Sequence, residues 1–348
     1  MEKAPDFNML YSREHEDTIM HSLQTLCGKE SFRPKLDHLK ELLSDDIEYI
    51  ETKCTVIVVG GTNGKGGTCH HLKNLLEQVN KKVALWTSPH VLSIRERFYC
   101  SDGHISYDEI SSFMDKYKQI AKTHELSFYE YLFFIYIKWV RTLNLDYVIL
   151  EVGLGGRFDG VNIFKNPLCA IVSISLDHTE ILGDDLKSIL FEKYGITRVG
   201  GRLISGIEQK FLVDTLKDWT KRDKISLIEI ERHEHSYEIN NQRLALALSQ
   251  ELGVQLTDEI VAKYHNEIVS SGSKGRREKM TINARDLIFI GAHNFDGIKK
   301  MLAELYELGE RNLIFVLGFS SGKEKWLKPI TKLFEGHKCV YENIFFVH

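Results

Sequence analysis

A glycine-rich turn at residues 60–68 carries the residues of this chain that are best suited to bind phosphate. The turn reads Gly-Gly-Thr-Asn-Gly-Lys-Gly-Gly-Thr, follows a β-branched run at 55–59 and precedes apolar residues at helical spacing. A strand, a turn and a helix N-terminus in this order surround one point with unpaired backbone N–H groups. The helix dipole also favours negative charge at that point. The motif therefore predicts a binding site for the phosphates of ATP.

This turn, called the phosphate loop below, differs from the usual nucleotide-binding loop in its spacing. Gly60 and Gly64 are one residue closer together than usual, and Gly66 stands where a hydroxyl normally follows the lysine. Lys65 would reach the β- and γ-phosphates, and the Thr68 hydroxyl would cap the helix or help to hold the ion. A glycine-rich hairpin turn is the alternative, which the flanking strand and helix disfavour. The residues predicted to contact ATP here are Gly61, Thr62, Asn63, Gly64, Lys65, Gly66, Gly67 and Thr68.

Polar residues follow other predicted strands as well. Ser88 and Glu151 stand at or just after the ends of two strands, and Asp177 and His178 follow a third. A carboxylate in such a place can bind Mg²⁺ directly or through water. Taken singly, each residue would serve equally well as a cap or an ion-pair partner. Because ligands gather beyond the carboxyl ends of parallel strands, we expect these side chains to share one rim.

The elements that must position these residues alternate along the chain. Strands are predicted at 55–59, 83–86, 146–152 and 168–174, and helices at 68–79, 128–143 and 183–195. This alternation is typical of an α/β domain with a mostly parallel sheet around a phosphate-binding loop. After a helix at 241–252, strands at 287–290, 313–317 and 344–347 with a helix at 296–307 predict a smaller α/β carboxyl-terminal domain. The glycine- and serine-rich stretch 270–276 places the domains at 1–272 and 273–348.

Composition narrows the class of protein. The hydrophobic content of 43% and charged content of 27% are typical of globular proteins, and a net charge of −4 offers no basic field for nucleic acid. The six cysteines form no Cys-x-x-Cys pair, which disfavours a zinc site. The most apolar run, 131–140, contains Lys138 and is too short to cross a bilayer. The amino terminus lacks the apolar core of a signal peptide. We expect a cytoplasmic protein that acts on small molecules, without nucleic-acid or membrane partners.

Five segments between residues 50 and 200 resemble the folylpolyglutamate synthase and dihydrofolate synthase branch of the Mur ligase superfamily. They are Gly61-Thr-Asn-Gly-Lys-Gly66, Thr87-Ser-Pro-His90 with Arg95-Glu-Arg97, Glu151-Val-Gly-Leu-Gly-Gly-Arg157, Leu176-Asp-His178 with Leu182-Gly183, and Glu192-Lys193-x-Gly195-Ile196. Weaker similarities follow at Asn241, at Gly275-Arg276-x-Glu278 and at Gly291-Ala-His-Asn294. The order and spacing of the segments agree with the family, which implies the central-domain fold of a Mur ligase.

The resemblance implies an ATP-dependent amide ligase. A folate or dihydropteroate carboxylate would attack the γ-phosphate of ATP and become an acyl phosphate, and the amino group of L-glutamate would then displace phosphate. Phosphorylation supplies the leaving group that a carboxylate lacks, and Mg²⁺ and Lys65 would meet the charge on the transferring group. Relatives are often monomeric, so a monomer is expected.

The resemblance also implies roles for single residues. The residues matching Ser88, Glu151 and His178 arrange Mg²⁺ in relatives, and the lysine matching Lys193 is carbamylated, which turns a cation into an anion able to hold a second metal. Without the family, Lys193 would be an ordinary helix-end cation. Lys65, His178 and Lys193 are thus the candidate catalytic residues. The residues expected at the nucleotide from later in the chain are Asn241, Arg276 and His293. Arg95 and Arg97 would lie near the pterin-bearing substrate, with surface arginines as the alternative.

Four departures from the family pattern affect mainly the second half. Gly67 replaces a Ser or Thr, Ile290 replaces the aspartate before Gly-Ala-His-Asn, and Tyr237-Glu238 stands where His-Gln is frequent. The chain is also shorter than its relatives. Two alternatives therefore stay open, namely a diverged nucleotide-binding homologue with little or no turnover and a Mur-type ligase for a different acceptor. The sequence does not separate dihydrofolate synthase from folylpolyglutamate synthase activity.

Overall fold

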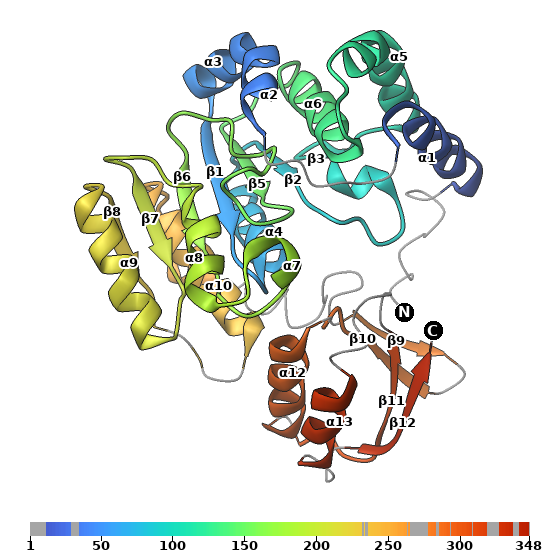
Figure 1. The fold of residues 1–348 in the computed structure, drawn as a ribbon, viewed down its shortest axis with the longest axis vertical. Helices are drawn as coiled ribbons and strands as arrows, with labels where there is room; N and C mark the ends of the chain where they lie inside the picture. The colour runs from blue at the N-terminus through green and yellow to red at the C-terminus, as the bar shows by residue number, and fades with distance from the viewer. Residues whose placement is uncertain are drawn as a thin grey trace.

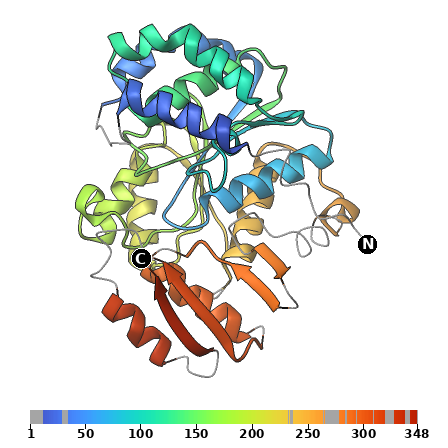
Figure 2. The same ribbon diagram turned by 90° about the vertical axis from the view of Figure 1, so that its right-hand side faces the viewer.

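The computed structural model describes residues 12–28, 35–231, 233, 236–262, 264, 278–282, 285–292, 294–307, 309–318, 327–336 and 341–347. They form a main unit around an eight-stranded sheet and a small unit that lies at one end of it in both views (Figures 1 and 2). The boundary predicted at residues 272 and 273 lies outside the described residues.

The sheet of the main unit is mostly parallel, as its β-branched strands predict. Its strand order is β4-β3-β2-β5-β1-β6-β7-β8, in which β3 and β4 run antiparallel at one edge. The strands are β1 (Thr55–Gly60), β2 (Val83–Trp86), β3 (Tyr99–Cys100), β4 (Gly103–His104), β5 (Tyr147–Glu151), β6 (Leu168–Ile171), β7 (Arg202–Ser205) and β8 (Ser226–Glu229). β1 is central, with β5 and β2 on one side of it and β6, β7 and β8 on the other. The strand order therefore reverses at β1, and the carboxyl ends of β5, β1 and β6 meet at this topological switch point.

Both faces of the sheet are covered by helices because successive side chains of each strand point in opposite directions. Val56 and Val58 belong to one hydrophobic core, whereas Ile57 and Val59 belong to the other. The second core is closed by α4 (Lys65–Gln78) and α10 (Tyr237–Glu251). The first core is closed by α6 (Phe128–Val140), α8 (Leu186–Tyr194) and α9 (Lys210–Arg222), together with α1 (Arg13–Cys27), α2 (Asp37–Leu42), α3 (Ser44–Lys53) and α5 (Tyr107–Thr123) (Figure 1).

The small unit has its own hydrophobic core. Its elements are β9 (Glu278–Ile282), β10 (Arg285–Phe289), α12 (Phe295–Glu307), β11 (Leu313–Gly318), α13 (Leu327–Glu335) and β12 (Tyr341–Val347). β9 and β10 pair antiparallel, and β11 and β12 pair parallel. Ile298, Leu302 and Phe334 are buried between the helices and β11. The prediction of a small α/β unit after the main sheet is confirmed at this level.

Most predicted elements agree with the structure, with one clear exception. The nearly all-apolar segment at 128–143 is the buried helix α6, in which only Tyr129 and Lys138 are half-buried. The single helix predicted at 183–195 is wrong in its start, because the chain forms a short helix α7 (Thr179–Leu182) and then α8. Asp185 separates them, since its side chain caps α8 by accepting bonds from Lys187 N and Ser188 N. Among the described residues, no helix is long and apolar enough to cross a membrane.

An aromatic cluster fixes the end of β2, from which the Thr-Ser-Pro-His turn starts. Trp86 is fully buried, contacts the rings of Phe98, Phe133 and Tyr136, and donates a 3.2 Å hydrogen bond from Nε1 to the hydroxyl of Tyr129. Ring pairs in these geometries add to the burial of apolar area. The cluster therefore joins β2 to α6.

Replacing Trp86 by Ala should lower the free energy of unfolding by about 4 kcal/mol, because it leaves a large cavity under the sheet. Urea denaturation measures this. Phe211→Ala is the matched control, since Phe211 is 54% exposed, and we expect it to change stability by less than about 0.5 kcal/mol. A loss of under about 1 kcal/mol for Trp86→Ala would contradict the role of the cluster.

Candidate functional site

The phosphate loop connects β1 to α4 and is held against the end of β6. Thr62 N donates to Ser173 O at 2.8 Å, and the Thr62 hydroxyl exchanges hydrogen bonds with the backbone of Ser175. Gly64 has φ +93°, a conformation that glycine adopts without cost, and directly precedes the first residue of α4. The loop thus presents its N–H groups at a helix N-terminus beside the switch point of the sheet.

Asn241 packs onto the first turn of α4. A Cβ atom on Gly64 would lie 2.4 Å from Asn241 Oδ1, and one on Gly67 would lie 2.3 Å from Asn241 Nδ2. Asn241 is buried, and its Oδ1 accepts a 3.3 Å hydrogen bond from the Thr68 hydroxyl. The absence of a side chain at position 67 is therefore matched by the amide of Asn241, which occupies that space.

Lys193 lies beneath the phosphate loop. Its Nζ donates a 3.0 Å hydrogen bond to the carbonyl of Gly61, and the residue is 4% exposed. Burial and the neighbouring charge of Lys65 lower the pKa of Lys193 to about 7, against the opposing influence of Asp177 and Asp159. Lys65 itself folds back so that Nζ donates to Thr62 O at 3.1 Å. Lys193 is thus a buried amine in contact with the phosphate loop, which disfavours the alternative of an ordinary helix-end cation.

Ser88 and Glu151 meet across two neighbouring strands. Glu151 ends β5 and is buried, and its Oε2 accepts a 3.0 Å hydrogen bond from Ser88 N. The Ser88 hydroxyl is buried and has no hydrogen-bond partner among the described residues. An orphaned buried oxygen beside a buried carboxylate is a group that a hard cation would satisfy.

His178 stands apart from this pair. Its side chain is 43% exposed, and its backbone has φ +48° where α7 begins. The preceding Asp177 is buried and accepts a 2.9 Å hydrogen bond from Asn294 of the small unit. In the part of the chain that the structure describes, no three His, Cys, Asp or Glu side chains converge as metal ligands. Ser88 and Glu151 are thus in direct contact and Lys193 contacts the phosphate loop, whereas His178 is partly exposed.

Two arginines on the loop after β2 are held in place by other side chains. Arg97 is 2% exposed, so the surface alternative is wrong for it, and its Nε donates to His90 Nδ1 at 3.0 Å. Burial and the charge of Arg97 lower the pKa of His90 to about 4, which keeps this acceptor neutral. Arg95 is half-buried on η2 (Ile94–Arg97) and lies over the ring of Tyr107.

The carboxylates that shape this loop were not identified from the sequence. Glu96 accepts 2.8 Å hydrogen bonds from the backbone of Val91, Leu92 and Ser93, and Glu16 on α1 accepts from the Ser93 hydroxyl and Ile94 N. The Ser93-x-x-Glu96 spacing is a capping-box signature that could have indicated the first of these. Glu16 carries no such signal, because its partners lie more than 70 residues away.

Asp159 is a third residue that was not identified from the sequence. It is 4% exposed and accepts hydrogen bonds from Leu154 N at 2.8 Å, Val161 N at 3.0 Å and the Tyr129 hydroxyl at 3.1 Å. Burial raises the pKa of Asp159 to about 6, although these donors oppose the rise. Its carboxylate holds the glycine-rich loop after β5 in shape.

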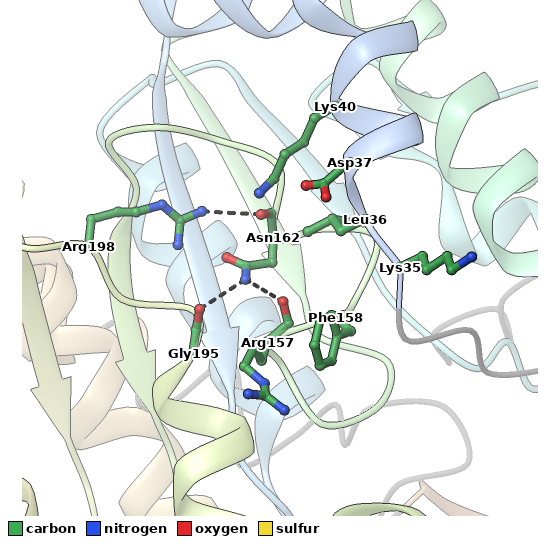
Figure 3. Close-up of a pocket in the computed structure, with 9 residues that line it drawn as sticks. All are labelled: Lys35, Leu36, Asp37, Lys40, Arg157, Phe158, Asn162, Gly195 and Arg198. Atoms are coloured by element: carbon green, nitrogen blue, oxygen red, sulfur yellow. Dashed lines mark hydrogen bonds between the residues drawn. The ribbon is translucent and has the colours of Figure 1, made fainter.

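A cavity of about 420 Å³ lies behind that glycine-rich loop (Figure 3). It is lined by Lys35, Leu36, Asp37, Lys40, Arg157, Phe158, Asn162, Gly195 and Arg198. Asn162 Nδ2 donates to the carbonyls of Arg157 and Gly195 at 2.9 Å each, and so ties the loop to the end of α8. Four cationic side chains against one carboxylate give the lining a net positive charge.

The small unit contributes Asn294 and Asp296 to the phosphate loop. Asn294 Nδ2 donates to Asn63 Oδ1 at 2.9 Å, and Asp296 lies within 3.3 Å of Asn63 Nδ2. Ile290 is half-buried and packs against the core of the small unit. The predicted nucleotide residues Arg276 and His293 lie outside the described residues.

The chain is similar to folylpolyglutamate synthases and dihydrofolate synthases, both in sequence and in structure. No family model matches the chain. The dihydrofolate synthase/folylpolyglutamate synthase of Haemophilus influenzae is 36% identical over 181 residues, which are 51% of this chain and 41% of that protein. The chain therefore spans less than half the length of that relative in this match. The Bacillus subtilis protein of the same name is 26% identical over 349 residues, covering 88% of this chain and 80% of that protein.

Solved structures show the same fold. Escherichia coli FolC in complex with DHPP and ADP has a TM-score of 0.76 at 24% identity and covers 95% of this chain and 89% of that chain. A bifunctional folylpolyglutamate synthase/dihydrofolate synthase with Mn, AMPPNP and L-glutamate bound has a TM-score of 0.76 at 20% identity, with 95% of this chain and 94% of that chain covered.

The contact between Gly67 and Asn241 yields a prediction about the first departure from the family pattern. Gly67→Ser should lower the free energy of unfolding by about 2 kcal/mol, because the added atoms meet the Asn241 amide. Adding Asn241→Ala to this variant should recover part of the loss by opening the space. Urea denaturation of the two single variants and the double variant measures the coupling. Strictly additive losses would show that the two positions do not compete for this space.

Proposed function

We propose that the chain is a member of the folylpolyglutamate synthase/dihydrofolate synthase family of the Mur ligase superfamily, and that it joins L-glutamate to a folate or dihydropteroate carboxylate with hydrolysis of ATP. The observation that carries the proposal is the buried Lys193 amine beneath the phosphate loop, next to Lys65. A loop built only to cap a helix has no need of a buried second lysine.

The phosphate loop supports ATP as the energy source. Its N–H groups lie at the N-terminus of α4, and Lys65 and Thr68 are the side chains suited to bind the phosphates. The hydrogen bond from the Thr68 hydroxyl to Asn241 Oδ1 stabilises the first turn of α4. Two related structures contain ADP or AMPPNP, which is consistent with this assignment.

The residues around Ser88 fit a divalent cation. The orphaned Ser88 hydroxyl and the buried Glu151 carboxylate are oxygen ligands of the kind that Mg²⁺ prefers. We assign Ser88, Glu151 and His178, with Lys193 in its carbamylated form, to hold it. Bound Mg²⁺ would neutralise charge on the transferring phosphoryl group.

Lys193 suits carbamylation because a large fraction of its amine is uncharged near pH 7. Only the neutral amine attacks CO₂, and an ordinary lysine with a pKa of about 10.4 is almost wholly protonated at that pH. The product is a carbamate anion, which removes the cost of a buried cation beside Lys65. Its oxygens would serve as metal ligands.

The reaction then needs one exchange at the γ-phosphorus and a second at the acyl carbon. A substrate carboxylate oxygen bonds to the γ-phosphorus as the bond to ADP breaks, with Lys65 offsetting the charge. The glutamate nitrogen next bonds to the acyl carbon, the C–O bond to phosphate breaks, and the amine proton leaves. Arg95 and Arg97 on the ordered loop, and the positive lining of the cavity beside Arg157, suit substrates that carry carboxylates.

One observation favours the alternative of a nucleotide-binding homologue without turnover. Ile290 packs into the core of the small unit, so the position at which the family has an aspartate offers no carboxylate to the nucleotide here. This alternative keeps ATP binding and removes ligation.

A product assay separates the two. The pure protein is incubated with Mg-ATP, L-glutamate and either dihydropteroate or a reduced folate, and phosphate release and product mass are measured. We expect product one glutamate heavier than the acceptor, with one phosphate released per amide formed. ADP formation that is independent of both organic substrates, or no ADP at all, would overturn the ligase proposal.

Carbamylation of Lys193 is tested with ¹³C-labelled bicarbonate and carbon NMR. The wild-type protein should show a carbamate signal that Lys193→Ala lacks, together with loss of ligase activity. The signal should fall as the pH drops below about 7, because protonation of the buried amine competes with CO₂. Lys210→Ala, which changes an 88% exposed lysine, is the matched control and should keep the signal. A signal that persists in Lys193→Ala would exclude this lysine as its source.

A further inference from the structure

The Asn63 side chain of the phosphate loop is the centre of a hydrogen-bond network that crosses from the main unit to the small unit. Its Nδ2 lies within 3.3 Å of four oxygen acceptors, which are Ser175 Oγ, Tyr237 Oη, Asn294 Oδ1 and Asp296 Oδ2. Asn63 Oδ1 accepts from Asn294 Nδ2 at 2.9 Å. Since an amide nitrogen has two protons, the acceptors outnumber its donors, and the surrounding groups fix its orientation.

Tyr237 and Asp296 close this network between the units. The Tyr237 hydroxyl donates a hydrogen bond to the Asp296 carboxylate, and the Lys300 ammonium lies 4.8 Å from the centre of the Tyr237 ring. Lys300 also pairs with Glu208 of the main unit. A hydrogen bond to an ionised acceptor is about twice as strong as one between neutral groups. A hydrogen bond to a carboxylate therefore joins α10 to the first turn of α12.

Asn294 extends the network to the loop that carries His178. It is 1% exposed, donates to Asp177 Oδ2 at 2.9 Å, and accepts from Gly297 N at 2.9 Å. A buried network of this kind is costly when it is only partly satisfied, because polar groups then lose their partners in a low dielectric. The position of α12, the shape of the phosphate loop and the shape of the Asp177 loop are thus linked.

Ile290 packs against the core of the small unit, so it brings no carboxylate to the phosphate loop. Asp296, six residues later, brings a carboxylate from the small unit to the phosphate loop. It acts on the loop through Asn63 and Tyr237, both of which it contacts.

We propose that Tyr237 and Asp296 are positioning residues that clamp the small unit onto the phosphate loop and hold Asn63 in the conformation that receives the nucleotide. The proposal rests on the proposed function only in taking ATP as the ligand. Because coupling of binding is reciprocal, bound nucleotide tightens the same clamp.

The test is the affinity for Mg-AMPPNP, measured by calorimetry without organic substrates. Tyr237→Phe removes the hydroxyl and keeps the ring. We expect the dissociation constant to rise about tenfold, because one hydrogen bond to a charged group is lost. Asp296→Asn should give a similar loss, and the double variant should be no weaker than either single one.

Glu304→Gln is the matched control. Glu304 lies on α12 and accepts a 3.1 Å hydrogen bond from Ser236, so the change disturbs another contact between the units without touching Asn63. We expect its affinity to equal that of wild type. In a wild-type protein that ligates, Tyr237→Phe should raise the KM for ATP about tenfold and leave kcat within about twofold.

The outcomes separate this proposal from the proposed function. Weaker binding in Tyr237→Phe and Asp296→Asn, a double variant no weaker than either, and an unchanged Glu304→Gln support the clamp even if the wild-type protein forms no amide. Equal affinity of Tyr237→Phe and wild type overturns the clamp even if ligation is observed. A loss of affinity that Glu304→Gln shares also overturns it, because any weakened contact between the units then has the same effect.

Discussion

The hydrogen bond from the buried Lys193 amine to the carbonyl of Gly61 is the contact on which the rest of the site depends. It places α8 directly beneath the phosphate loop, and burial next to Lys65 makes a full positive charge on Lys193 costly. We therefore expect this amine either to stay neutral or to be carbamylated. Gly156 allows the arrangement, since a Cβ there would lie 2.9 Å from the carbonyl of Glu192. The glycine-rich loop after β5 can thus lie against α8.

Residues close together in the sequence could be predicted well, because strand, turn and helix signals are local. The phosphate loop, its strand and its helix follow from the run at 55–79 alone. Asp159 and Glu16 could not be found in this way, since only the fold buries one and brings the other to Ser93. The Asn63 network joins residues up to 233 positions apart. No local pattern encodes such a contact.

Two departures from the family pattern have a physical explanation in the structure. Gly67 lacks a side chain where the Asn241 amide lies, and Tyr237 reaches the phosphate loop and Asp296 with its hydroxyl. The changes are therefore accompanied by contacts that keep the loop in shape. Ile290 differs, because it simply joins the core of the small unit. The contacts of the phosphate loop thus accommodate Gly67 and Tyr237, whereas Ile290 contributes only to the core of the small unit.

The central claim is that the phosphate loop binds ATP through Lys65. Calorimetric titration of the wild-type protein and of Lys65→Ala with Mg-ATP tests it most directly. We predict saturable binding by the wild-type protein and an affinity lower by about a hundredfold in the variant, since Lys65 is a charged partner of the phosphates. Equal affinity of the two proteins, or no binding by the wild-type protein, would contradict the account.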